Sequence, residues 1–131
     1  KGYLCMSIDV GFQINPSGVR GQISGGIAQG AGWALYENLV FQEGMPQNTS
    51  LSNYILMGIK DMPDITAIAV ETNDPVGPYG AKGVGEPTLI PIPPAIANAV
   101  EDAIGVRIRE LPISPEKVFW ALNPQLREVG K

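Results

Sequence analysis

The segment VRGQISGGIAQGAGWALYEN, residues 19–38, decides the fold class of this chain. Apolar side chains recur in it and directly after it at steps of three and four residues, at Val19, Ile23, Ile27, Ala31, Ala34, Leu35 and Leu39. This spacing puts them on one face of an α-helix. We therefore expect an amphipathic helix from Val19 to about Asn38.

Five glycines interrupt the same segment, at Gly21, Gly25, Gly26, Gly30 and Gly32. Each glycine inside a helix costs up to about 1 kcal/mol relative to alanine. So many glycines require a reason in the tertiary structure, which is the close approach of another backbone or of a ligand. The sequence leaves both reasons open.

Two amides in this segment could face a ligand. Gln22 and Gln29 lie about two helical turns apart and so point to the same side of the helix. Amides both donate and accept hydrogen bonds, which suits a heterocycle with mixed edges. The alternative is that both glutamines face solvent.

The elements around this helix predict an α+β fold of mixed helices and short strands. Strands are expected at 3–10 and 65–72, and shorter ones at 39–42 and 106–108. The proline and glycine of residues 14–18 predict a turn. Pro94 opens a helix that Gly105 stops. Ser114-Pro115-Glu116 starts another, which ends at Asn123-Pro124.

A glycine- and proline-rich loop, NDPVGPYGAKGVGEP, occupies residues 73–87. Its glycines allow backbone N–H groups to approach a ligand closely, and its prolines restrict its freedom. Glu86 is the one carboxylate in the stretch 77–87. If partly desolvated, it would have a pKa raised toward the range of a general base. The alternatives are that Glu86 caps the next segment or pairs with Lys82, and that the glycines only form turns.

Composition excludes several classes of function. The 131 residues suffice for one domain, and no window approaches the length of a membrane span. The absence of histidine removes Ser-His-Asp and Cys-His catalysis. The acidic residues are too scattered to propose metal ligands. A net charge of −4 without a basic cluster argues against nucleic acid. The single cysteine, Cys5, is expected to be buried and suits a reducing compartment, so we expect a cytoplasmic protein.

Taken together, GQISGGIAQGAGWALYE and GPYGAKGVGEP resemble the molybdopterin-binding large subunit of the xanthine dehydrogenase/aldehyde oxidase family. The strand-like ITAIAVET, the segment PAIANAVEDAIGVRI and the ending PISPEKVFWAL also resemble the C-terminal region of that subunit. The resemblance runs from Ile8 to Leu122, and the order of the paired motifs is specific.

The resemblance implies an oxidoreductase, a molybdenum hydroxylase that inserts water-derived oxygen into N-heterocycles or aldehydes. It implies a molybdenum–molybdopterin cofactor, such as the cytosine dinucleotide form, with iron–sulfur clusters and often flavin on other domains or subunits. Glu86 then matches the general base. Gln22 matches the amide that hydrogen-bonds the pterin. Gly83, Val84 and Gly85 would shape the loop at the metal, which Lys82 precedes, and these four residues are expected to bind the cofactor together with Gln22.

The resemblance also implies that more of the protein is needed. The family's subunit runs to several hundred residues, so residues 1–131 are expected to be a C-terminal segment of its molybdopterin-binding domain. The expected partners are the remainder of that subunit and the iron–sulfur and flavin subunits. The isolated segment is expected to be inactive. Two alternatives stay open: a non-catalytic folding or subunit-interaction module of the same ancestry, and a small-molecule binder that uses Gly80–Gly85 as an anion nest.

Overall fold

The computed structural model describes residues 2–128 of the chain. Its strands are β1 (Tyr3–Asp9), β2 (Phe41–Gln42), β3 (Met45–Pro46) and β4 (Asp64–Val70). Its α-helices are α1 (Pro16–Leu35), α2 (Ile92–Ile104) and α3 (Pro115–Leu122), with single 3₁₀ turns η1 (Pro78–Gly80), η2 (Glu86–Thr88) and η3 (Pro124–Glu128). The chain forms two compact units. One comprises the residues up to Gly30 together with Gly58–Ile92, and the other comprises Ala31–Met57 and the residues from Pro93 onward.

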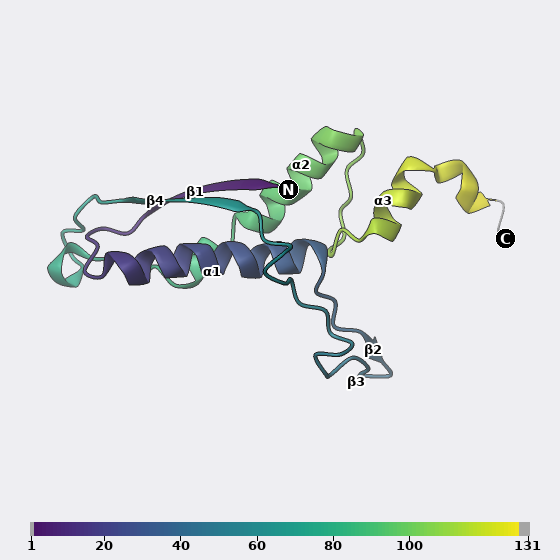
Figure 1. Ribbon diagram of the computed structural model, residues 1–131, viewed down its shortest axis with the longest axis horizontal. Coiled ribbons are helices and arrows are strands. Elements are labelled where there is room, and N and C mark those ends of the chain that lie inside the picture. Colours follow the sequence, from purple (N-terminus) through teal and green to yellow (C-terminus); the bar gives the residue numbers. More distant parts are fainter. Residues whose placement is uncertain (1, 129–131) are drawn as a thin grey trace. The chain divides into compact units, whose positions relative to one another are not determined.

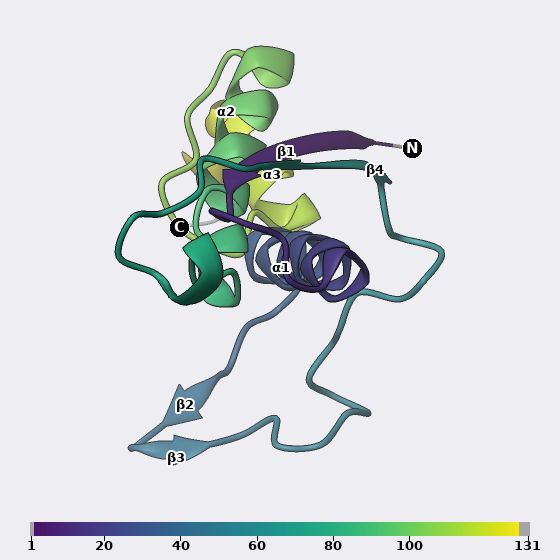
Figure 2. The same cartoon turned by 90° about the vertical axis from the view of Figure 1, so that its left-hand side faces the viewer.

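The first unit is a helix against a parallel strand pair. β1 and β4 pair in parallel from Tyr3 opposite Asp64 to Asp9 opposite Val70. The crossover between them contains α1, which lies along one face of the pair (Figures 1 and 2). The buried side chains of this unit are Met6, Val10, Val19, Ile23, Ile27, Thr88, Leu89 and Ile92. The apolar row predicted for the helix is therefore buried from Val19 to Ala34. The prediction is wrong for its last two members, because Leu35 is only half-buried and Leu39 lies beyond the end of α1 and is exposed.

Helix α1 starts and ends earlier than its apolar pattern predicts. The Asn15 side chain accepts a hydrogen bond from Gly18 N (3.0 Å), so Asn15 caps the helix and Pro16 takes the first helical position. The turn predicted at residues 14–18 is therefore wrong beyond Asn15. At the other end, Tyr36 N and Glu37 N both donate to Gly32 O, which widens the last turn and ends the helix at Leu35.

The second unit contains a short hairpin and two helices. β2 and β3 pair antiparallel, and their turn has Glu43 and Gly44 at positive φ. In the same unit Ile113 N donates to Ala34 O at 2.6 Å, and both residues are buried. Helix α3 has the predicted Ser114 cap, whose hydroxyl accepts from Lys117 N, and Asn123 follows its last residue.

Three local expectations are corrected by the structure. Residues 106–108 form no strand because no neighbouring strand pairs with them among the described residues. Helix α2 begins at Ile92, not Pro94, because prolines are tolerated in a first turn, where N–H groups have no partner inside the helix. Cys5 is exposed rather than buried, since it alternates with the buried Met6 along β1.

The fold is α+β, as the sequence predicts, with mixed helices and short strands. Within residues 2–128, no helix combines the length and apolar character needed to cross a bilayer.

Candidate functional site

Helix α1 packs tightly against the segment from Gly85 to Ile92. A Cβ atom on Gly26 would lie 2.0 Å from Thr88 Oγ1, and one on Gly30 would lie 2.6 Å from Ile92 Cβ. Only glycine at these two positions allows the segment to come so close. For Gly26 and Gly30, the reason left open by the sequence is therefore the approach of the protein's own chain.

Thr88 makes the polar link across this contact. Its side chain is fully buried, and Thr88 Oγ1 lies 2.8 Å from Gly85 O and 3.2 Å from Gln22 O, to which it can donate. One acceptor belongs to the glycine-rich loop and the other to α1. The hydroxyl therefore ties the loop to the helix turn that carries Gln22.

A cavity of about 260 Å³ lies beside this contact. Helix α1 contributes Gln22, Gly25, Gly26 and Gln29, and the loop side contributes Gly85, Glu86, Thr88 and Leu89. The two glutamines do share one face of the helix, as their spacing predicts. Gln22 Oε1 lies 4.0 Å from the position that a Cβ on Gly85 would take, and a Cβ on Gly25 would meet no atom within 4 Å. The cavity wall thus combines amides, one carboxylate and backbone without side chains.

Glu86 presents an exposed carboxylate at this cavity. The carboxylate makes no hydrogen bond or ion pair with any other residue in the range 2–128. It therefore does not pair with Lys82, which was one alternative. The partial desolvation expected for this carboxylate is also not provided by the described residues.

Lys82, Gly83 and Val84 lie in the same loop but do not line the cavity. The Lys82 ammonium pairs with Asp9 at 2.5 Å, and Lys82 N donates to Val10 O at 2.9 Å. This pairing anchors the loop to the end of β1. A direct contact of these three residues with a cofactor stays a prediction.

The ion pair shifts the titration of both partners. The hydrogen bond from Lys82, supported by those from Gly11 N and the Thr72 hydroxyl, lowers the pKa of Asp9 to about 2. The hydrogen bond to Asp9 in turn raises the pKa of Lys82. Both groups therefore stay charged over a wide range of pH, and the anchor persists with them.

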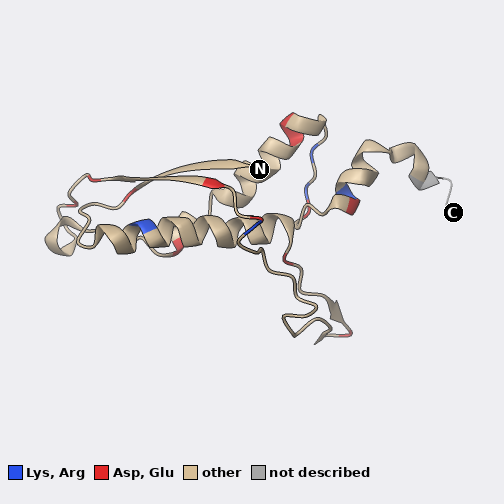
Figure 3. Ribbon diagram, viewed as in Figure 1, with Lys and Arg blue, Asp and Glu red and all other residues tan. Residues whose placement is uncertain are grey.

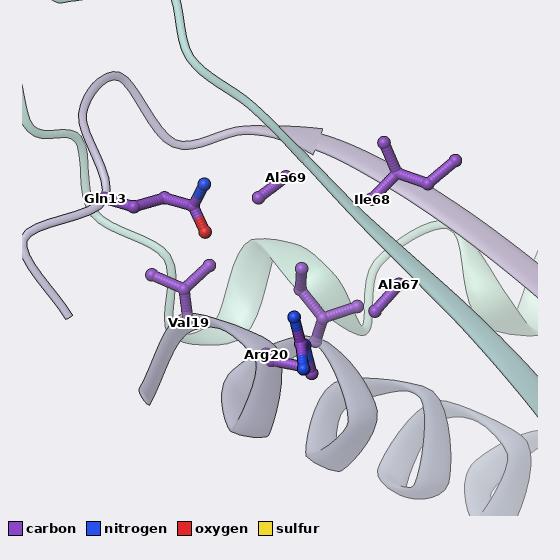
Figure 4. Close-up of a pocket in the computed structure, with 7 residues that line it drawn as sticks. Gln13, Val19, Arg20, Ala67, Ile68 and Ala69 are labelled. Atoms are coloured by element: carbon purple, nitrogen blue, oxygen red, sulfur yellow. The ribbon is translucent and has the colours of Figure 1, made fainter. Parts of the chain in front are cut away.

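A second cavity, of about 310 Å³, lies between α1 and β4 (Figure 4). It is lined by Gln13, Val19, Arg20, Ile23, Ala67, Ile68 and Ala69. Arg20 is the one charged residue in this lining, so the cavity offers no carboxylate for acid–base chemistry. Charged residues are otherwise scattered along the chain (Figure 3), and no three His, Cys, Asp or Glu residues within 2–128 could together hold a metal ion.

Thr88 and Asp9 also shape the site, and no sequence pattern predicts either of them. The spacing of Thr88, two residues after Glu86, carries no motif that would have identified it. Asp9 stands at a strand end, 73 positions from Lys82, and only the strand pairing brings them together.

Comparisons with known proteins show the family to which this chain belongs. Residues 3–63 match the family described as the molybdopterin cofactor-binding domain. The chain is 39% identical over 113 residues to the xanthine dehydrogenase molybdenum-binding subunit of Escherichia coli O157:H7, covering 85% of this chain and 15% of that protein. It is 43% identical over 117 residues to 6-hydroxypseudooxynicotine dehydrogenase complex subunit gamma of Paenarthrobacter nicotinovorans, covering 86% and 15%.

A solved structure shows the same fold. Quinoline 2-oxidoreductase from Pseudomonas putida 86 superimposes with a TM-score of 0.84 at 37% identity, over 91% of this chain and 16% of that one. The chain therefore spans about a sixth of the length of the proteins that it matches.

Proposed function

Because this chain belongs to the xanthine dehydrogenase/aldehyde oxidase family of molybdopterin-binding subunits, we propose that it carries the general base and part of the cofactor site of a molybdenum hydroxylase. Its substrates are N-heterocycles or aldehydes, and the oxygen that it inserts comes from water. The chain is one segment of the larger molybdopterin-binding domain, so the activity belongs to the whole assembly.

One observation carries this proposal. Gln22 and Glu86 are 64 positions apart in the sequence and line the same cavity of about 260 Å³. A purely structural loop would not require an amide and a carboxylate to converge on one open concavity. Their convergence therefore favours the enzyme over the non-catalytic module.

The residues present fit a molybdenum–pterin cofactor. The Gln22 amide can both donate to and accept from the mixed edge of a pterin. Gly25 and Gly85 leave the cavity wall free of side chains, so a flat group could approach the backbone there. Gln22 and Gly85 would hold the cofactor directly, and Lys82, Gly83 and Val84 would set the path of the loop beside it.

When bound, this cofactor supplies the oxygen nucleophile and accepts the two electrons that substrate oxidation releases. Glu86 accepts the proton that the water-derived oxygen nucleophile gives up. Its carboxylate is exposed at the cavity and has no partner within the described residues. The tie between Lys82 and Asp9 keeps the loop in place while the proton moves. Other parts of the subunit would have to cover Glu86 to exclude water.

The electron-transfer partners are proposed from the same family membership. Iron–sulfur clusters and, in many relatives, flavin would lie on other domains or subunits, and one relative is by name a subunit of a complex. The single cysteine of this segment suits a reducing compartment, and we place the enzyme in the cytoplasm.

The test is Glu86→Gln in the full subunit assembled with its partners. Loss of a general base lowers turnover by about 10²–10⁴-fold, while molybdenum content should stay near that of the wild type. Glu43→Gln is the matched control, because Glu43 is exposed in the hairpin turn between β2 and β3. Turnover close to wild type in the Glu86 variant would refute the assignment.

A further inference from the structure

Thr88 is the one polar side chain that is fully buried among residues 2–128, with 0% exposure. A buried hydroxyl is costly unless it is hydrogen-bonded. Thr88 meets this requirement with two backbone carbonyls, Gly85 O at 2.8 Å and Gln22 O at 3.2 Å. Both acceptors belong to residues that line the cavity.

The bond to Gly85 O acts directly on Glu86. The carbonyl of Gly85 and the N–H of Glu86 belong to the same planar peptide unit. A donor that holds the carbonyl therefore fixes the orientation of the peptide from which Glu86 continues. Gly85 has φ −63° and ψ −100°, outside the ordinary helical and extended ranges, so the direction of this peptide depends on its partners.

The other side of Glu86 is held as well. Glu86 O accepts a hydrogen bond from Leu89 N at 3.0 Å, and Pro87 restricts the backbone angles of the residue before it. Both peptide units that flank Glu86 are thus constrained. Thr88 provides the one constraint that reaches across to α1.

Gly26 makes room for this arrangement. A Cβ on Gly26 would lie 2.0 Å from Thr88 Oγ1 and 2.9 Å from the Thr88 carbonyl carbon. The hydroxyl therefore sits in a notch of α1 that only glycine can form. The absence of a side chain at Gly26 thus sets how closely Thr88 approaches α1, and Thr88 in turn sets the distance between the helix and the Glu86 peptide.

We propose that Thr88 is a positioning residue for Glu86, which it holds at the cavity through the Gly85 peptide. This inference rests on the proposed role of Glu86 as general base. Thr88 itself touches neither substrate nor reacting atoms in this scheme. Its hydroxyl, rather than its bulk, is the group that matters.

The test compares Thr88→Val, which keeps the shape and removes the donor, with Thr88→Ser, which keeps the donor. Both are made in the assembled holoenzyme. Thr66→Val is the matched control, because the Thr66 hydroxyl accepts only an exposed hydrogen bond from Tyr3 Oη on the strand pair of the same unit. Turnover, its pH profile, molybdenum content and hydrogen exchange of residues 85–89 are measured for each.

We expect Thr88→Val to lower kcat by about 10–100-fold at unchanged molybdenum content, as is typical when the support of a reacting group is removed. The acidic limb of the kcat/KM profile, which reports the general base, should shift. Hydrogen exchange of residues 85–89 should become about tenfold faster. Thr88→Ser and Thr66→Val should match the wild type in all four measurements.

Wild-type turnover and exchange in Thr88→Val would overturn the inference. Loss of molybdenum or failure to assemble in that variant, with Thr88→Ser intact, would assign the hydroxyl to folding and would overturn it too. Glu86→Gln is measured in parallel, so that failure of the positioning role of Thr88 can be told apart from failure of the proposed function. If Glu86→Gln remains active, the general base is misassigned, whatever Thr88 does to hydrogen exchange.

Discussion

Replacing Gly26 by alanine tests the contact on which the whole site is built. The added Cβ would lie 2.0 Å from Thr88 Oγ1, 2.6 Å from Thr88 Cβ and 2.9 Å from the Thr88 carbonyl carbon. All three distances are below 3.0 Å, which real Cβ atoms essentially never show. Because one of these atoms is backbone, rotation of the Thr88 side chain cannot relieve the clash. The segment 85–89 would have to move away from α1.

Two opposing effects set the size of the change. Overpacking a buried contact costs about 1–3 kcal/mol, and displacing Thr88 also weakens a buried hydrogen bond worth about 1 kcal/mol. Alanine returns about 1 kcal/mol through its higher helix propensity. With a backbone atom involved, the clash belongs at the upper end of its range. We therefore expect the free energy of unfolding to fall by about 2–3 kcal/mol.

Gly21→Ala is the matched control in the same helix. A Cβ on Gly21 would meet no atom within 4 Å, so only the propensity gain remains, about 0.5–1 kcal/mol of added stability. Urea unfolding followed by far-ultraviolet circular dichroism would compare the two variants, and hydrogen exchange of residues 85–89 would localise the loss. If Gly26→Ala were as stable as Gly21→Ala, the packing of Thr88 against α1 would be wrong.

Two further outcomes follow from the same geometry. Gly25→Ala should leave the free energy of unfolding unchanged or raise it by up to about 1 kcal/mol, because the added Cβ meets no protein atom. It should nevertheless lower the molybdenum content of the purified holoenzyme, because Gly25 lines the cavity. Normal molybdenum content would show that no cofactor approaches the backbone at Gly25. Asp9 has its pKa lowered from 3.8 to about 2 in the folded chain, so its pairing with Lys82 stabilises the fold above about pH 4 and is lost as the pH falls through 2. Urea midpoints between pH 4 and 2 should therefore decline less steeply in Asp9→Asn than in the wild type, and equal slopes would contradict the pairing.

Local patterns predicted most of the secondary structure. The apolar row from Val19 to Ala34 is buried, and Ser114 caps α3 as its hydroxyl and the following proline indicate. Gly105 ends α2 with a φ of 72°. These features depend on neighbours within a turn or two of helix. The strand expected at 106–108 is wrong, because a strand exists only where a distant partner supplies its hydrogen bonds.

The site was predictable in part. The family resemblance selected Gln22 and Glu86, and the structure brings both to one cavity. The resemblance did not identify Thr88, because the importance of Thr88 comes from its hydrogen bonds to two backbone carbonyls, one of which belongs to a residue 66 positions away. Nor did it pair Lys82 with Asp9, because that contact depends on the parallel register of β1 and β4.

The sequence by itself determined which residues could do chemistry here. The chain has no histidine and one cysteine, so carboxylates such as Glu86 are its candidates for a general base, and the order of two glycine-rich motifs identifies the family. Only the tertiary structure decided what each glycine is for. Gly26 and Gly30 admit the protein's own chain, whereas Gly25 opens onto the cavity. The sequence shows where a Cβ atom is absent. Which atoms take its place depends on long-range packing, which brings α1 and residues 85–92 together.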